Sequence, residues 1–272
     1  MPTYENYGVS ILKKTLLDVI FASEKRKNTL LLLQDGPKEM EFLLNPLDTT
    51  RQALLPQIRI LEDHYLITHS HDVYELTTIG KLIVDYMEPI IDKIGVFDTD
   101  IDYWGTHYLD FVPSHLLKRI DELGQCTLIK PHITELYEIN KEFHEATKKS
   151  KSHYIVTTFL HPNFPELTAE LTGANVEIYF ITSQVLFDKL LEEKYDEFSS
   201  MLSNKLIHVF VSPREMDFQF ISVNDYYIIM ALLKTGKEVD LSYLLCSSEK
   251  SLKWGKDFFD FYLKDSTLIT EI

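Results

Sequence analysis

The order of the elements between residues 23 and 80 limits the fold of this chain more than any other feature. Ser23 is a favourable helix N-cap and Asp35-Gly36-Pro37 is a strong stop signal, so a helix is expected over residues 24–34. A second, short helix is expected over residues 38–44, directly after the stop signal. Two short helices joined by a tight turn are typical of a helix-turn-helix.

A third helix is expected over residues 51–63, with Thr49 or Thr50 as its cap. Its apolar side chains recur at spacings of four and three: Leu54, Ile58 and Leu61. The opposite face is then polar and partly cationic, as in a recognition helix that meets base edges and phosphates. Pro56 lies inside this helix and removes one backbone donor, so we expect it to kink or tighten the helix.

Two alternating segments, residues 65–68 and 73–76, surround the polar tip His69-Ser70-His71-Asp72 and predict a hairpin, the wing. Three helices followed by a two-stranded wing indicate a winged helix-turn-helix that binds double-stranded DNA; the alternative is a small helical domain with an incidental hairpin. The residues expected to contact DNA are Lys25, Arg26, Thr50, Arg51, Gln52, Arg59, His69 and His71.

The formal net charge of −15 is distributed unevenly along the chain. Residues 1–96 hold 10 Lys/Arg and 14 Asp/Glu, whereas residues 97–272 hold 17 and 28. Within residues 13–59 the balance is reversed, with 8 basic side chains and 6 acidic ones. We therefore expect local phosphate contacts with strong salt dependence, against a repulsive field from the rest of the molecule.

A helix that could join two subunits is expected after the wing, over residues 78–94, with Thr77 or Thr78 as cap and Pro89 as a bend. Its apolar side chains recur at near-helical spacing: Ile79, Leu82, Ile83, Tyr86, Ile90 and Ile94. Residues 11–21 present a similar face. Both helices could instead pack within one subunit. DNA-binding dimers with two-fold symmetry need an apolar helix face of this kind, so we favour a homodimer.

The rest of the chain predicts an α/β domain with a mainly parallel sheet, after an irregular, acidic-aromatic segment over residues 98–111. The expected strands are residues 126–129, 154–160, 176–181, 206–211, 218–223, 227–232 and 239–245. The expected helices are residues 113–123, 134–149, 165–172, 184–201 and 250–264. The resulting division is a DNA-binding domain with a dimerisation helix (1–97), a connector (98–130) and an effector-binding domain (131–272).

Ligands of such domains bind beyond the carboxyl ends of parallel strands. The polar residues expected at those ends are His161, Thr182, Ser183, Ser212 and Arg214. Arg214 is suited to an anion, and the helix N-terminus at Pro165 could contribute. The alternative for each residue is an ordinary solvated loop side chain.

No catalytic signature accompanies these residues. The chain has no nucleophile elbow, phosphate loop, dinucleotide fingerprint or Cys-x-x-Cys, so no enzymatic activity and no cofactor are expected. His64, His69 and His71 lack the partners of a metal shell. Cys126 and Cys246 are interpreted as buried thiols. Without a membrane-length apolar run or a signal segment, a cytoplasmic protein is expected.

Several motifs resemble a family of archaeal regulators from methanogens, named for control of methanogenesis and filamentous growth. They are Lys25-Arg26-Lys27, the run from Ala53 to Glu62, Leu76-Thr77-Thr78-Ile79-Gly80-Lys81, Tyr103-Trp104, the run from His115 to Ile120, Leu123-Gly124, and the run from His161 to Leu167. The resemblance implies an N-terminal winged helix and a C-terminal sensor domain. That sensor domain also resembles half of a phospholipase D fold, but none of the ten histidines is followed two places later by the lysine such enzymes need.

Three functions follow as hypotheses. The first is a ligand-responsive, DNA-binding transcriptional regulator that acts as a homodimer and has an unknown small-molecule or protein effector. The second is a protein-interaction output module of a signalling system, which would not bind DNA even at low salt. The third is a phospholipase D-type phosphodiesterase, which the absent motif disfavours.

Overall fold

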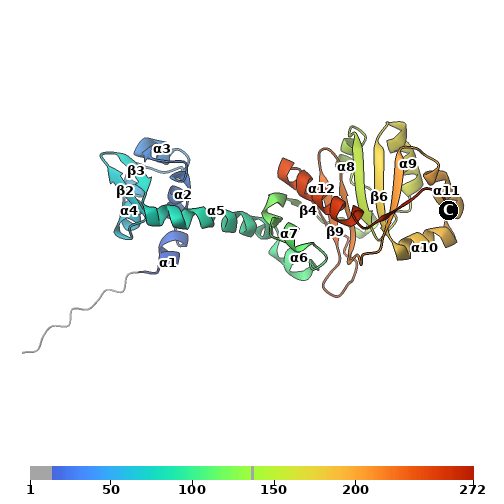
Figure 1. The fold of residues 1–272 in the computed structure, drawn as a ribbon. Coiled ribbons are helices and arrows are strands. Elements are labelled where there is room, and N and C mark those ends of the chain that lie inside the picture. The colour runs from blue at the N-terminus through green and yellow to red at the C-terminus, as the bar shows by residue number, and fades with distance from the viewer. Residues whose placement is uncertain (1–13, 136–137) are drawn as a thin grey trace, which may run out of the picture. The chain divides into compact units, whose positions relative to one another are not determined.

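The computed structural model describes residues 14–135 and 138–272 of the chain. They form two compact units, one that ends at Ile91 and one that begins at Asp92, each with its own buried apolar cluster. Helix α5 (Thr78–Asp98) begins in the first unit and ends in the second (Figure 1). None of the described helices combines the length and apolarity that a membrane span requires.

The first unit has the order of elements expected for a winged helix-turn-helix. Its helices before α5 are α1 (Leu16–Phe21), α2 (Glu24–Leu32), α3 (Met40–Leu44) and α4 (Arg51–Asp63). Its strands are β1 (Lys38–Glu39), β2 (Ile67–Ser70) and β3 (Val73–Leu76), paired antiparallel in the order β1-β3-β2. The bounds and the buried stripe of α4 are confirmed, and the helix continues through Pro56.

Three details of this unit differ from the expectation. Lys38 and Glu39 add a short strand to the wing instead of starting the second helix, because they pair with β3. The strand expected from residue 65 begins at Ile67, because Tyr65 has a φ of +58° and belongs to the turn after α4. Helix α5 extends four residues beyond residue 94, to Asp98. Residues 11–13 of the expected N-terminal face lie outside the described part.

At Gly80, helix α5 lies close against the backbone of Leu66, the residue before β2. The Thr77 hydroxyl accepts the Gly80 N–H at 3.0 Å, and a Cβ at Gly80 would overlap the Leu66 carbonyl group. Helix propensity favours alanine over glycine by about 1 kcal/mol, but overpacking costs about 1–3 kcal/mol or more against a backbone atom that cannot yield.

We therefore expect Gly80→Ala to lower the free energy of unfolding of the first unit in a denaturant titration. Gly95→Ala on the same helix, where a Cβ meets nothing within 4 Å, is the matched control and should be neutral or stabilising. If the two variants change the free energy of unfolding equally, the close approach at Gly80 does not affect stability.

The second unit contains one eight-stranded sheet with helices on both faces. Its strands are β4 (Thr127–Ile129), β5 (Ser152–Thr157), β6 (Glu177–Ser183), β7 (Ile207–Ser212), β8 (Phe218–Val223), β9 (Ile228–Leu232), β10 (Tyr243–Cys246) and β11 (Thr267–Ile269). Its helices besides α5 are α6 (Ile101–Thr106), α7 (Ser114–Leu117), η1 (Ile120–Leu123), η2 (Ile133–Glu135), α8 (Lys141–Thr147), α9 (Phe164–Gly173), α10 (Gln184–Glu193), α11 (Tyr195–Leu202) and α12 (Glu249–Leu263).

The sheet is mixed, with the strand order β11-β7-β6-β5-β8-β9-β10-β4. Only β5–β6 and β6–β7 are parallel, and the other neighbouring pairs are antiparallel. The α/β class is thus confirmed, but the expected mainly parallel pairing is wrong. Two of the antiparallel pairs, β8–β9 and β9–β10, join consecutive strands with no helix between them, whereas parallel pairs need a long crossover. The pairs β5–β8, β7–β11 and β4–β10 join strands that are not consecutive in the chain.

Each face of the sheet is covered by its own cluster. The side chains of Val156 and Ile181 belong to a buried cluster with residues of α7, η1 and α12, while those of Ile155 and Phe180 belong to a second cluster with residues of α9, α10 and α11. The segment expected to be an irregular connector joins the first cluster: α6 is a helix capped by Asp100, and its Tyr103 and Trp104 are buried.

Other helices are shorter than expected. The helix expected over residues 113–123 is divided into α7 and η1, and the one over residues 184–201 breaks at Lys194 into α10 and α11. In place of a helix over residues 134–149, the structure has η2 and α8; residues 136 and 137 lie outside the described part.

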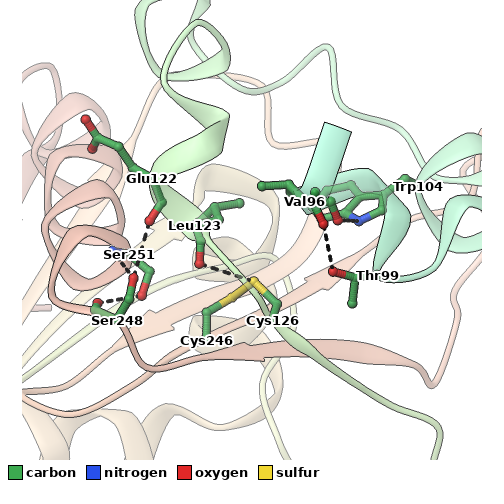
Figure 2. The surroundings of a disulfide bond; sticks show 10 residues. Val96, Thr99, Trp104, Glu122, Leu123, Cys126, Cys246, Ser248 and Ser251 are labelled. Carbon is green, nitrogen blue, oxygen red and sulfur yellow. Dashed lines mark hydrogen bonds between the residues drawn. A yellow bond between two sulfur atoms is a disulfide. The ribbon is translucent and has the colours of Figure 1, made fainter. Parts of the chain in front are cut away.

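Cys126 and Cys246 form a disulfide, which corrects the interpretation of both as thiols (Figure 2). The register between β10 and β4 pairs Leu245 with Thr127, so the next residues, Cys246 and Cys126, face each other. Their Cα atoms are 4.4 Å apart, and both side chains are buried. The bond ties the edge strand β4 and the η1 segment before it to the start of α12 (Figure 2).

Candidate nucleic-acid interface

The N-terminus of α4 presents polar side chains to solvent. Thr50 caps the helix by accepting the Ala53 N–H at 3.4 Å, and Thr50, Arg51 and Gln52 are exposed. Arg59 follows on the same side two turns later and is also exposed. Because Leu54, Ile58 and Leu61 are buried against the core, this outer face is the one that can meet a ligand.

The first cation of α4 is paired with the tip of the wing. Arg51 Nη1 donates to Asp72 Oδ2 at 3.0 Å, and Arg51 Nη2 donates to Asp72 Oδ1. The hydrogen bond from Arg51 lowers the pKa of the Asp72 carboxyl below its ordinary value, and the same bond raises the pKa of Arg51. Both side chains remain about half exposed, so the ion pair lies at the surface.

The wing contributes the two expected histidines. His69 lies on β2, contacts Glu62 of α4, and stacks on Tyr74 with 5.3 Å between the ring centroids. His71 is in the turn, has a φ of +58°, and its Nδ1 lies 3.2 Å from the Ser70 hydroxyl. The structure therefore places His69 and His71 on the same hairpin as Asp72, the partner of Arg51.

Arg26 is not available for DNA, which corrects the expectation. It is 8% exposed, and its guanidinium donates to Gln57 Oε1 at 2.8 Å and to the backbone carbonyls of Asp18 at 3.4 Å and Val19. These bonds join α1, α2 and α4. Its neighbour Lys25 is half-buried and remains a candidate contact.

We expect Arg26→Ala to destabilise the first unit by about 1–3 kcal/mol, because it removes the buried guanidinium whose hydrogen bonds join α2 to α1 and α4. Lys27→Ala is the control, since Lys27 pairs with the exposed Glu24 one turn earlier, with 2.7 Å between Nζ and Oε2. The measurement is denaturant unfolding of both variants. A loss of DNA affinity in Arg26→Ala without any loss of stability would contradict the structural role.

Of the residues expected to bind a ligand, the structure brings together Ser183 and Ser212, which are register partners on β6 and β7. Ser183 caps α10 by accepting the Leu186 N–H at 3.2 Å, and the Ser212 hydroxyl accepts the Arg214 N–H at 3.2 Å. Thr182 is fully buried and lies on the opposite sheet face from Ser183, because side chains alternate along a strand. His161 Nδ1 accepts the Asn163 N–H at 3.2 Å within the loop before α9.

Arg214 is the one of these residues that carries charge. It pairs with Asp265, and its guanidinium lies 4.2 Å from the centre of the Phe261 ring. Its Nε is buried and has no hydrogen-bond partner among the described residues. Over residues 14–135 and 138–272, no cluster of three or more His, Cys, Asp or Glu side chains suits a metal ion.

Sequence reasoning missed the partners of the expected cations. Asp72 stood in the predicted hairpin tip without a role, and Glu62 stood on the expected third helix. The feature that could have identified Asp72 as a partner of Arg51 was its position in the two-residue turn between β2 and β3, which the structure places opposite the N-terminus of α4.

Two family models match this chain. The N-terminal domain model of the methanogenesis regulatory protein FilR1 matches residues 14–95, and the middle domain model of the same protein matches residues 136–265. The curated methanogenesis regulatory protein FilR1 of Methanothrix harundinacea (strain 6Ac) is 21% identical in an alignment 267 positions long, which covers 93% of this chain and 58% of that protein. The chain thus spans little more than half the length of this relative.

Solved structures with some likeness are more distant. TrmBL2, described as an archaeal chromatin protein with a novel mode of DNA binding, is 11% identical, with a TM-score of 0.41, over 93% of this chain and 97% of TrmBL2. Nuc, a phospholipase D family member from Salmonella typhimurium, is 9% identical, with a TM-score of 0.35, over 46% of this chain and 87% of Nuc. At these scores neither likeness carries an argument.

Proposed function

This chain belongs to the FilR1 family of methanogenesis regulatory proteins, and we propose that it is a transcriptional regulator of an archaeal methanogen that binds double-stranded DNA. The observation that carries the proposal is the first turn of α4, where Thr50, Arg51 and Gln52 are exposed beside the wing tip. Unpaired backbone N–H groups at a helix N-terminus attract phosphate, and the side chains of that turn reach base edges. Arg59, Lys25, His69 and His71 complete the proposed contact surface.

We further propose that two copies bind DNA together through α5. Four large apolar side chains of this helix, Ile79, Leu82, Tyr86 and Ile90, are 49–73% exposed. Their spacings of three, four and four place them on one stripe, which differs from the stripe of Val84 and Met87 that packs into the unit's core. An apolar stripe of this kind fits a second copy of the same helix related by two-fold symmetry.

Effector sensing is assigned to the second unit as part of the same proposal. Arg214 supports it, because its buried Nε keeps an unused donor and its backbone N–H donates to the hydroxyl of Ser212, the last residue of β7. An effector with an anionic group would displace Asp265 from the guanidinium. A cavity lined by Leu160, Phe164 and Leu190 among others belongs to the cluster of α9, α10 and α11, and its volume of about 30 Å³ is on the scale of a water molecule.

The test is binding of the purified protein to duplexes from its own upstream region, followed by fluorescence anisotropy at two salt concentrations. We expect tight binding that weakens steeply with salt and exceeds that of a scrambled duplex. Arg51→Ala should weaken the specific complex by about 1–3 kcal/mol if Arg51 makes a two-point base contact.

Lys205→Ala, which removes an exposed cation of the second unit, is the charge-matched control and should bind as the unaltered protein does. Unchanged affinity in Arg51→Ala would refute the role of Arg51. An absence of binding at both salt concentrations would favour a protein partner for the winged helix, or an effector that must be present first.

A further inference from the structure

We propose that Asp72 is a specificity-determining residue of the interface, because it holds the Arg51 guanidinium in an orientation that favours a guanine edge over a phosphate. This inference rests on the proposed DNA-binding function. Arg51 and Asp72 are 21 positions apart in the sequence, and their side chains form a two-point ion pair in the structure.

Both partners are attached to well-held backbone. Arg51 begins α4, whose cap Thr50 accepts the Ala53 N–H at 3.4 Å. Asp72 ends the turn between β2 and β3, and its carbonyl oxygen accepts the Met40 N–H at 3.2 Å, which joins the turn to α3. The ion pair therefore links two anchored elements. It restricts a long arginine side chain that would otherwise sample many rotamers.

The ion pair leaves Arg51 able to read a base. A guanidinium has five N–H donors in a planar fork, and the Asp72 carboxylate takes up two of its nitrogens at one edge. The remaining donors include the Nε–H edge, and half of the Arg51 side chain is exposed. Two parallel donors of this kind match the O6 and N7 acceptors of guanine in the major groove.

The same ion pair discourages phosphate contacts. A phosphate that approaches Arg51 meets the Asp72 carboxylate, and Glu41 adds a second negative charge near the guanidinium. His69 is the other charged or titratable group near Asp72 that favours its carboxylate form. Guanine is neutral, so its approach brings no like-charge repulsion. Asp72 therefore disfavours sequence-independent binding and leaves the base contact intact.

The experiment starts with selection of duplexes from a random 30-base-pair pool by the unaltered full-length protein. Affinity for the enriched duplex and for its scrambled version is then measured with Asp72→Asn. We expect scrambled-duplex affinity to rise, and the ratio of specific to scrambled affinity to fall by about 5- to 100-fold. In an Arg51→Ala background, Asp72→Asn should leave the ratio unchanged, because the effect of Asp72 passes through Arg51.

Glu75→Gln is the matched control, since Glu75 is exposed on the same hairpin and the charge change is identical. It should raise both affinities together and preserve the ratio. If Asp72→Asn also preserves the ratio, or lowers it equally in the Arg51→Ala background, the proposal is overturned while DNA binding stands. If the unaltered protein enriches no duplex, the proposed function fails and the role of Asp72 fails with it.

Discussion

Removing the Cys126–Cys246 disulfide is expected to lower the free energy of unfolding of the second unit by about 2–5 kcal/mol, because the bond closes a long loop in the unfolded chain. The two cysteines are 120 positions apart, and the bond secures β4, the edge strand that pairs with β10. A double Cys126→Ser, Cys246→Ser variant should therefore unfold at lower denaturant concentration. The measurement is a denaturant titration followed by near-ultraviolet circular dichroism.

Reductant supplies the internal control for this prediction. Dithiothreitol should destabilise the unaltered protein by a similar amount and leave the double serine variant unchanged, because the chain has only these two cysteines. Thiol titration of the denatured, unreduced protein should find no free thiol. If the titration finds two free thiols, and dithiothreitol does not change the free energy of unfolding, the cysteines are buried thiols and the prediction is wrong.

Charges on the apolar stripe of α5 are expected to separate the two copies and weaken DNA binding by about 100-fold, because two linked half-site contacts bind far more tightly than one. The change is Leu82→Glu with Ile90→Glu, at two of the most exposed apolar positions of the helix. Light scattering should report the mass of a single chain, 31.8 kDa, instead of twice that mass. Anisotropy with the enriched duplex measures the loss of affinity.

Lys81→Glu changes the net charge by the same amount on the polar face of the same helix, and Lys81 is exposed. This control should remain dimeric. The stripe has no role in assembly if the double variant also keeps the mass of two chains. A monomeric double variant that binds DNA unchanged would separate assembly from recognition and contradict the proposal that two copies bind together.

Local chemistry explains why part of the fold was predictable. The start of α4 depends on the Thr50 hydroxyl and the Ala53 N–H, three residues away, so capping residues in the sequence were sufficient. Its buried stripe followed from the spacing of Leu54, Ile58 and Leu61. The first strand of the hairpin was placed two residues too early because the left-handed backbone of Tyr65 has no clear sequence signal, whereas the bounds of the second strand are confirmed.

Non-local contacts explain what the sequence missed. The pairing of β8 with β5 and β9, and hence the mixed sheet, depends on which strands meet in three dimensions. The disulfide depends on the β4–β10 register, which brings together residues that are distant in the chain. Arg26 illustrates the same limit, since it stands in the run Lys25-Arg26-Lys27 that predicts a cationic surface.

The sequence by itself determined the order of elements, the capped and amphipathic α4, and the motifs of the regulator family. Each of these features depends on residues that are only a few positions apart in the chain. Only the tertiary structure decided which cations are free. Arg26 is buried where α1 and α4 meet α2, and Arg51 is paired because the wing turn brings Asp72 to the start of α4. Those contacts depend on the packing of elements that are far apart in the chain, which no local pattern records.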